Sequence, residues 1–173
     1  FSKILIDAIK KNNGATIFGY RVLDPERYGV VEINKNNEVI SIAEKPKKPK
    51  SNIAITGIYF YDNDVIDIAK MIKPSNRNEL EITSINDEYL KKNKLNVSIL
   101  GRGFAWLDTG THESMMDASH FVQTIEKRQG FKIACVEEIA FNKKWITKSE
   151  LKKRIKFYEN TEYGNYLSKL ITH

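Results

Sequence analysis

Residues 52–62, NIAITGIYFYD, form the most continuous apolar run in the chain. Its β-branched and aromatic residues favour a strand, and a strand with little polar alternation is typical of one buried on both faces. Such a strand needs a layer of structure above it and another below it. The run therefore predicts a layered sheet, with Gly57 as the one interruption in its middle.

Shorter strands are predicted on both sides of this run. Each combines β-branched or aromatic residues with a flanking Gly, Pro, Asp or Asn, and the polar turn of residues 35–37 is typical of a hairpin. These strands cover residues 15–22, 29–34, 38–44, 95–101 and 132–136.

Helices are predicted from apolar spacing and from capping residues. An amphipathic helix opens the chain and ends before Gly14, and Thr147 with Glu150 forms a capping box in the tail. The other helices are expected after a cap at Asp62 or Asn63, over 79–92, and over 111–129 with Met115, Ala118, Val122 and Ile125 facing inward. The order predicts an α/β fold, a mixed sheet layered with helices, followed by a helical C-terminal tail.

Composition excludes several classes of protein. With 173 residues, 41% hydrophobic and 29% charged, the chain fits one globular domain, and no stretch reaches the roughly 20 apolar residues of a membrane span. One cysteine, Cys135, excludes an internal disulfide and favours a reducing compartment. The histidines at 112, 120 and 173 lack metal-ligand spacing, and no serine lies in a nucleophile motif.

The net charge of +6 permits either nucleic acid or phosphorylated small molecules as partners. Two lysine-rich clusters, residues 45–50 and 143–156, carry much of this charge. Neither is interleaved with the stacking aromatic residues expected of a single-strand binder. Solvated surfaces are therefore the simpler interpretation of both clusters.

Polar residues at strand ends and in loops are the remaining candidates for a site, because α/β proteins place their sites there. Tyr28, Glu44, Lys45, Arg77 and Asp108 all have such positions. Taken singly, each has an ordinary structural explanation, such as a packing contact, a surface ion pair or a helix-entry turn.

Taken in order, the segments that hold these residues resemble bacterial sugar nucleotidyltransferases, and among them most closely the glucose-1-phosphate thymidylyltransferase branch. The resemblance covers essentially the whole chain, including the tail, and implies the C-terminal part of a Rossmann-like fold. The segments are RVLDPERYGVVE, EKPKKPKSN, TGIYFYD, RNELEITSINDEYL, GRGFAWLDTGTHESMM, GFKIACVEEIAF and YGNYLSKLI.

The resemblance implies a role for each matching residue. Glu44 would accept hydrogen bonds from sugar hydroxyls, while Lys45 and Arg77 would bind the sugar phosphate and act in catalysis. Asp108, also catalytic, would help to bind Mg²⁺. The sugar pocket would be lined by Tyr28, Gly29, Ile55, Tyr59 and Trp106.

Members of this branch make dTDP-glucose and pyrophosphate from dTTP and glucose 1-phosphate, for dTDP-rhamnose, other deoxysugars and cell-surface polysaccharides. The attacking phosphate oxygen is already ionised, so positioning and charge neutralisation replace a general base. The resemblance also implies a cytoplasmic homo-oligomer, a tetramer when full-length, with neither a membrane nor a nucleic acid as partner.

Two expected parts of the family pattern are missing from the sequence. No glycine-rich G-x-G-T-R-L-x-P loop occurs, and neither does the D-N-I-F-Y-G-like motif with a second magnesium aspartate. The chain is therefore interpreted as one incomplete domain, inactive alone and with an unpaired sheet edge. Residues 1–130 would bind the sugar phosphate, and residues 131–173 would serve oligomerisation and regulation.

Some alternatives remain open. A regulatory nucleotide site is implied near Arg102, Ile133, Ala134, Glu138 and Ile139, although residues 133–139 are explained equally well as core and helix start. A UTP- or ATP-using relative, or a non-catalytic regulatory domain with the same fold, would share most of these features. A nucleic-acid-binding domain rests on the charge alone.

Overall fold

The computed structural model describes residues 1–172 and divides them into two compact units, Phe1–Trp106 and the residues from Leu107 onward. The first unit holds a five-stranded sheet with the strand order β3-β2-β4-β1-β5. Its elements in chain order are α1 (Ser2–Lys11), β1 (Ala15–Arg21), the short 3-10 helix η1 (Pro25–Arg27), β2 (Gly29–Ile33), β3 (Val39–Glu44), β4 (Ile53–Tyr61), α2 (Val65–Met71), α3 (Ile82–Lys91) and β5 (Leu95–Ile99).

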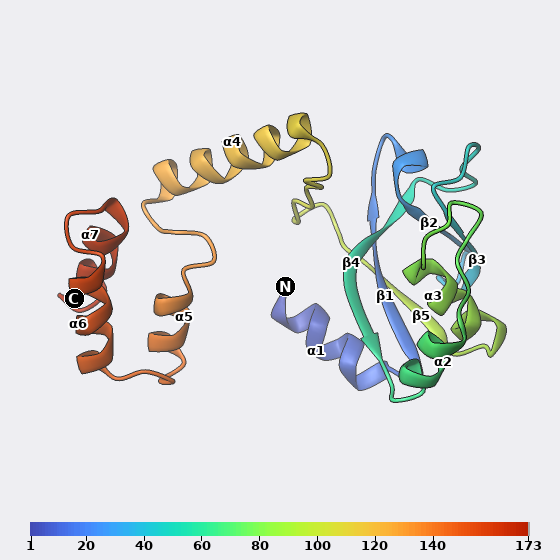
Figure 1. Cartoon of the computed structure of the whole chain (residues 1–173), viewed down its shortest axis with the longest axis horizontal. Helices are drawn as coiled ribbons and strands as arrows, with labels where there is room; N and C mark the ends of the chain where they lie inside the picture. Colours follow the sequence, from blue (N-terminus) through green and yellow to red (C-terminus); the bar gives the residue numbers. More distant parts are fainter. Residues whose placement is uncertain (173) are drawn as a thin grey trace. The chain divides into compact units, whose positions relative to one another are not determined.

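The sheet is mixed, as predicted. β1 runs parallel to β5 and antiparallel to β4, and the β2–β3 hairpin pairs antiparallel with β4 through β2. Asn37 takes the left-handed conformation that the tight turn of this hairpin requires, with a φ of 61°. Helix α1 covers one face of the sheet, and α2 and α3 cover the other (Figure 1).

The long apolar run forms β4, but only its first half matches the prediction of a strand buried on both faces. Residues 53–56 are buried, whereas Gly57 is exposed and residues 58–61 are half-buried. The pairing register with β1 shifts by two residues at this glycine, which indicates a bulge. β2 is registered against β4 only at Val30 and Ala54, so the second half of β4 is paired along one edge alone among the described residues.

Two expectations for helix positions are wrong in the first unit. Helix α2 begins after Asp64, and neither Asp62 nor Asn63 forms the expected cap. The Asp62 carboxylate instead accepts hydrogen bonds from the Tyr89 hydroxyl and the Asp64 amide, at 2.6 and 3.1 Å. Helix α3 begins three residues later than predicted, because residues 75–81 form a loop of their own.

The second unit is helical and consists of α4 (His112–Gln129), α5 (Val136–Asn142), α6 (Lys148–Phe157) and α7 (Glu162–Lys169). Gly130 ends α4 in the left-handed conformation, and the predicted capping box of Thr147 and Glu150 begins α6. No residue of α4 is buried. Of the four residues predicted to face inward, Met115 is exposed and the other three are half-buried. No described helix is both long enough and apolar enough to cross a membrane.

The predicted strand at residues 132–136 is absent. Residues 133 and 134 form a turn, with a φ of 55° at Ala134, and Cys135 directly precedes α5. The apolar side chains of this segment find no sheet neighbours. The buried Cys135 packs instead against Leu151 of α6 and Leu167 of α7, so the segment belongs to a helical core.

Candidate functional site

Glu44 is positioned by the β2–β3 hairpin. It is the last residue of β3 and lies opposite Gly29, the first residue of β2. A Cβ atom placed on Gly29 would lie 3.1 Å from Glu44 Oε2 and 3.2 Å from Thr83 Oγ1, so little space is left there for any larger residue. Thr83, at the start of α3, donates its hydroxyl hydrogen bond to Glu44 Oε2 at 2.5 Å. Three separate elements therefore fix one carboxylate.

Arg77 reaches the same carboxylate from the loop before α3. Its Nη1 lies 3.8 Å from Glu44 Oε1 and 3.5 Å from Glu81 Oε1, and its Nη2 lies 2.9 Å from Glu79 Oε2. The loop backbone is fixed by Ser75, whose hydroxyl oxygen accepts the Arg77 amide hydrogen bond at 3.1 Å. The guanidinium is thus paired with three carboxylates beside Glu44, and its planar fork of donors is of the kind that also suits an oxyanion.

Apolar and aromatic side chains border these charges. Ile55 Cδ1, on β4, would lie 3.6 Å from a Cβ atom placed on Gly29. Tyr59, also on β4, has a pKa above its ordinary value, first because it is partly buried and second because the Glu44 charge lies nearby. We define the Glu44 cluster as Gly29, Glu44, Ile55, Tyr59, Arg77 and Thr83.

Two further predicted pocket residues contact each other next to this cluster. Tyr28 precedes Gly29, and its ring meets that of Trp106 edge-on at a centroid distance of 5.0 Å. The Tyr20 ring also lies near Trp106, at a centroid distance of 6.0 Å. The predicted aromatic wall is therefore a packed group of rings in the first unit.

Lys45 leaves β3 in an unusual backbone conformation. Its φ of 41° is left-handed, which is uncommon for a residue with a side chain. Its amide donates a hydrogen bond to the Tyr28 carbonyl at 3.0 Å, and the residue is exposed. A strained conformation held by neighbouring strands is frequent at ligand sites.

Asp108 lies in the second unit, where it begins the turn that leads into α4. Its Oδ2 accepts a hydrogen bond from the Gly110 amide at 3.2 Å, and Thr111 caps the helix. A carboxylate is the oxygen ligand that Mg²⁺ prefers, and one or two carboxylates with substrate phosphates are enough. No group of three or more His, Cys, Asp or Glu residues within 1–172 forms a metal cage, and His173 lies outside the described residues.

The structure brings together most of the predicted sugar-phosphate residues. Glu44 and Arg77 are in contact, Lys45 follows Glu44 directly, and Ile55 and Tyr59 border them. The convergence of Asp108 with them stays a prediction.

The sequence reasoning missed the residues that hold this cluster, namely Thr83, Glu79, Glu81 and Ser75. A signal was available, because Glu79, Glu81 and Thr83 alternate with apolar residues inside the quoted segment RNELEITSINDEYL, and such alternation is not helical.

The predicted regulatory residues make contacts mainly at the start of α5. The Ile133 amide donates to Glu126 Oε1 at 2.9 Å, and Glu138 Oε2 accepts the Tyr166 hydroxyl at 2.6 Å. Ala134 occupies the turn, Ile139 is exposed, and Arg102 belongs to an exposed loop of the first unit. Their regulatory role stays a prediction.

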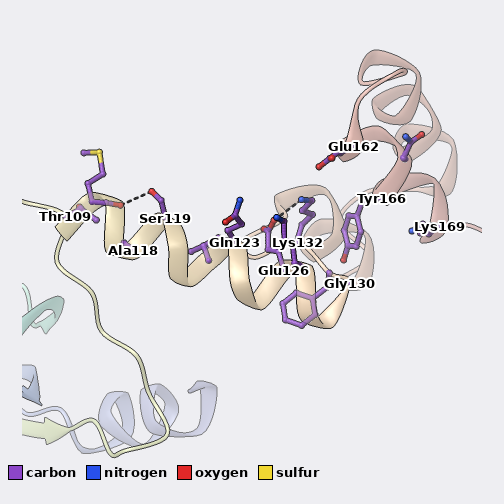
Figure 2. A pocket seen from close by; sticks show the side chains of 15 residues that line it. Thr109, Ala118, Ser119, Gln123, Glu126, Gly130, Lys132, Glu162, Tyr166 and Lys169 are labelled. Carbon is purple, nitrogen blue, oxygen red and sulfur yellow. Dashed lines mark hydrogen bonds and ion pairs between the residues drawn. The ribbon is translucent and has the colours of Figure 1, made fainter. Parts of the chain in front are cut away.

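Figure 2 shows an open cleft of about 990 Å³ within the second unit, between α4, the turn after Gly130, and α7. Both polar and apolar side chains line it, and two of the lining residues, Lys132 and Glu126, form an ion pair of 2.8 Å. None of the five predicted regulatory residues lines this cleft.

Chemically, the Glu44 cluster combines hydrogen-bond acceptors for hydroxyls, a guanidinium for an anion, and an apolar border. This is the composition of a small polar-ligand site. Its hydroxyl–carboxylate pair, Thr83 with Glu44, holds the Glu44 side chain in place, and the cluster as a whole suits binding and charge neutralisation.

Known proteins that are similar in sequence to this chain are named as enzymes that act on a sugar phosphate, which agrees with the groups present in the Glu44 cluster. Over 171 residues, 99% of the chain, it is 54% identical to a glucose-1-phosphate thymidylyltransferase of Neisseria gonorrhoeae, of which it spans 59%. It is 51% identical over 160 residues to the enzyme of that name from Xanthomonas campestris, covering 92% of the chain and 54% of the relative. The chain thus spans little more than half the length of these curated relatives.

Solved structures give the same fold. A Bacillus anthracis protein described as a glucose-1-phosphate thymidylyltransferase, in complex with sucrose, superposes with a TM-score of 0.61 at 43% identity, over 69% of this chain and 47% of that one. A UDP-glucose pyrophosphorylase superposes with a TM-score of 0.62 over 70% and 49%. At 24% identity this second likeness shows the fold alone.

The family model described as nucleotidyl transferase matches residues 1–125, which include every member of the Glu44 cluster as well as Asp108. The sheet order, the cluster and this match agree, and the chain belongs to the nucleotidyl transferase family.

Proposed function

We propose that this chain is the sugar 1-phosphate-binding part of a glucose-1-phosphate thymidylyltransferase. The observation that carries the proposal is the contact of Glu44 with Arg77 beside Ile55 and Tyr59. A carboxylate for hydroxyls and a guanidinium for a phosphate match the two ends of glucose 1-phosphate. The names of the relatives support this sugar and the thymidine nucleotide.

In the proposed reaction an oxygen of the sugar phosphate forms a bond to the α-phosphorus of dTTP. The bond from that phosphorus to the bridging oxygen breaks, and pyrophosphate leaves with the electron pair. Arg77 and Lys45 would orient the attacking phosphate and reduce the repulsion between two polyanions. Asp108 would hold Mg²⁺, which when bound supplies further charge neutralisation on the phosphates.

The same proposal includes the cellular role of the whole enzyme. We propose that it is a cytoplasmic oligomer whose product is used for dTDP-rhamnose synthesis. The 173 residues contain no glycine-rich G-x-G-T-R-L-x-P loop. We therefore expect this chain alone to bind glucose 1-phosphate without transferring a nucleotidyl group.

Isothermal titration calorimetry, which measures the affinity of the chain for glucose 1-phosphate, tests the proposal. Binding should be weakened about tenfold or more by Arg77→Gln, because the charge-assisted fork is lost. Arg21→Gln removes an exposed arginine whose Nη1 donates to Asn52 Oδ1 at 3.0 Å, and is the matched control. Equal affinity in both variants, or no binding by the wild-type chain, would overturn the proposal.

A further inference from the structure

Arg77 is surrounded by more negative charge than it carries. Three carboxylates lie within 4 Å of its guanidinium, and they differ in exposure. The Glu81 side chain is 12% exposed and Glu44 is 22% exposed, whereas Glu79 is 57% exposed. The two less exposed carboxylates lie at Nη1, and the exposed Glu79 carboxylate lies at Nη2, at the shortest of the three distances, 2.9 Å.

We propose that Glu79 is an internal competitor for the anion site of Arg77, displaced when the phosphate of the substrate binds, while Glu81 is a positioning residue that keeps the guanidinium in place. This inference rests on the proposed function, because it assigns the anion as a sugar phosphate. It also explains why an anion-binding arginine lies among carboxylates.

The loop geometry allows this exchange without movement of the backbone. The Glu79 carbonyl accepts the Ser75 amide hydrogen bond, and the Ser75 carbonyl accepts that of Asn78, both at 2.8 Å. Both ends of the turn around Arg77 are therefore fixed. Only the exposed Glu79 side chain has to rotate for Nη2 to become available.

Glu81 has the opposite character. Its Oε1 accepts the Ser75 hydroxyl at 3.0 Å and also lies 3.5 Å from Arg77 Nη1. Glu81 thus connects the arginine to the serine that organises the loop. Being mostly buried, it is not replaceable by an incoming phosphate, and its charge holds Nη1 toward Glu44.

The strengths of the two contacts favour exchange at Glu79. An exposed ion pair contributes little because water and salt screen it. A phosphate offers two oxygens to the guanidinium fork, which is the stronger geometry. Removing Glu79 should therefore strengthen phosphate binding, an outcome that a purely structural role cannot produce.

The test is titration of glucose 1-phosphate into four versions of the chain. Glu79→Gln should bind about two- to fivefold more tightly than wild type, the range given by loss of one exposed ion pair. Glu81→Gln should bind about fivefold more weakly or worse. Asp67→Asn, which removes an exposed carboxylate paired with Lys70 at 3.2 Å, has the same charge change and should bind like wild type.

Asp67→Asn separates contact from long-range charge, because it makes the same charge change at a carboxylate that is paired with Lys70 and not with Arg77. Unchanged or weaker binding by Glu79→Gln, an equal gain in Asp67→Asn, or wild-type binding by Glu81→Gln overturns the inference while leaving wild-type binding, and with it the proposed function, intact. A wild-type chain that does not bind the sugar phosphate overturns both.

Discussion

Replacing Gly29 with alanine should disrupt the Glu44 cluster while leaving the fold intact. The added methyl group would lie 3.1 Å from Glu44 Oε2 and 3.2 Å from Thr83 Oγ1, closer than these atoms tolerate comfortably. The backbone is no obstacle, because Gly29 is not among the residues with a positive φ. The Glu44 carboxylate must therefore shift away from the methyl group, and we expect its 2.5 Å hydrogen bond from Thr83 to break.

The size of the effect follows from two opposing contributions. A hydrogen bond to a charged group contributes about 1.5–3 kcal/mol, and the lower end applies because the Glu44 side chain is 22% exposed. Alanine in place of glycine within a strand restores about 0.5–1 kcal/mol. Stability to denaturant should therefore fall by only about 0.5–1 kcal/mol. The glycine contribution does not offset a loss in binding, so losing the hydrogen bond, about 1.5 kcal/mol, should lower the affinity for glucose 1-phosphate about tenfold.

A double-mutant cycle with Thr83→Val identifies the cause. If Gly29→Ala acts by separating Glu44 from Thr83, the two variants remove the same interaction, and their effects on stability will not add. Denaturant unfolding and calorimetric titration of the four proteins give both quantities. Additive effects, or an alanine variant with wild-type affinity, would refute this account of the site.

Three further predictions concern the rest of the molecule. Gly164→Ala should lower the free energy of unfolding of the helical tail by about 2 kcal/mol or more, measured by denaturant unfolding, because its Cβ would lie 2.1 Å from the Tyr158 carbonyl oxygen; an unchanged midpoint would contradict this. Burial raises the pKa of Glu137, but hydrogen bonds from Tyr163 and Arg154 outweigh it and hold that pKa below the ordinary 4.5. The stabilisation is therefore present above about pH 4.5 and is lost as pH falls through the lowered pKa, so acidification should lower the melting temperature of the tail more in wild type than in Glu137→Gln. The half-paired edge of β4 should cause concentration-dependent association in sedimentation experiments, which a monodisperse monomer at high concentration would contradict.

Local patterns were sufficient to predict most of the strands and helices. The capping box at Thr147, the glycine after α4 and the hairpin before Glu44 depend on neighbouring residues only, and all three are confirmed. Residues 132–136 were misassigned because their apolar character is satisfied by α6 and α7, which lie far along the chain. A local pattern does not distinguish a sheet partner from a helical one.

The site shows the same division. Glu44 and Arg77 were predicted as substrate residues from the motifs that contain them, and they lie in contact. The residues that hold them in place escaped prediction, because Thr83 and Glu81 gain their roles only when the loop before α3 folds back on β3. The alternation of Glu79, Glu81 and Thr83 with apolar residues indicates a segment that is not helical, but it does not say which side chains that segment contacts.

The bulge in β4 has a consequence for motion. The strand that carries Ile55 and Tyr59 is paired with β1 on both sides of Gly57, but it is paired with β2 only before that glycine. Amides beyond that glycine should exchange with deuterium sooner than those before it, since fewer bonds must open. The half of β4 that holds Tyr59 is thus the more mobile one. A ligand that contacts it would order this half of the strand, and binding would carry the entropic cost of that ordering.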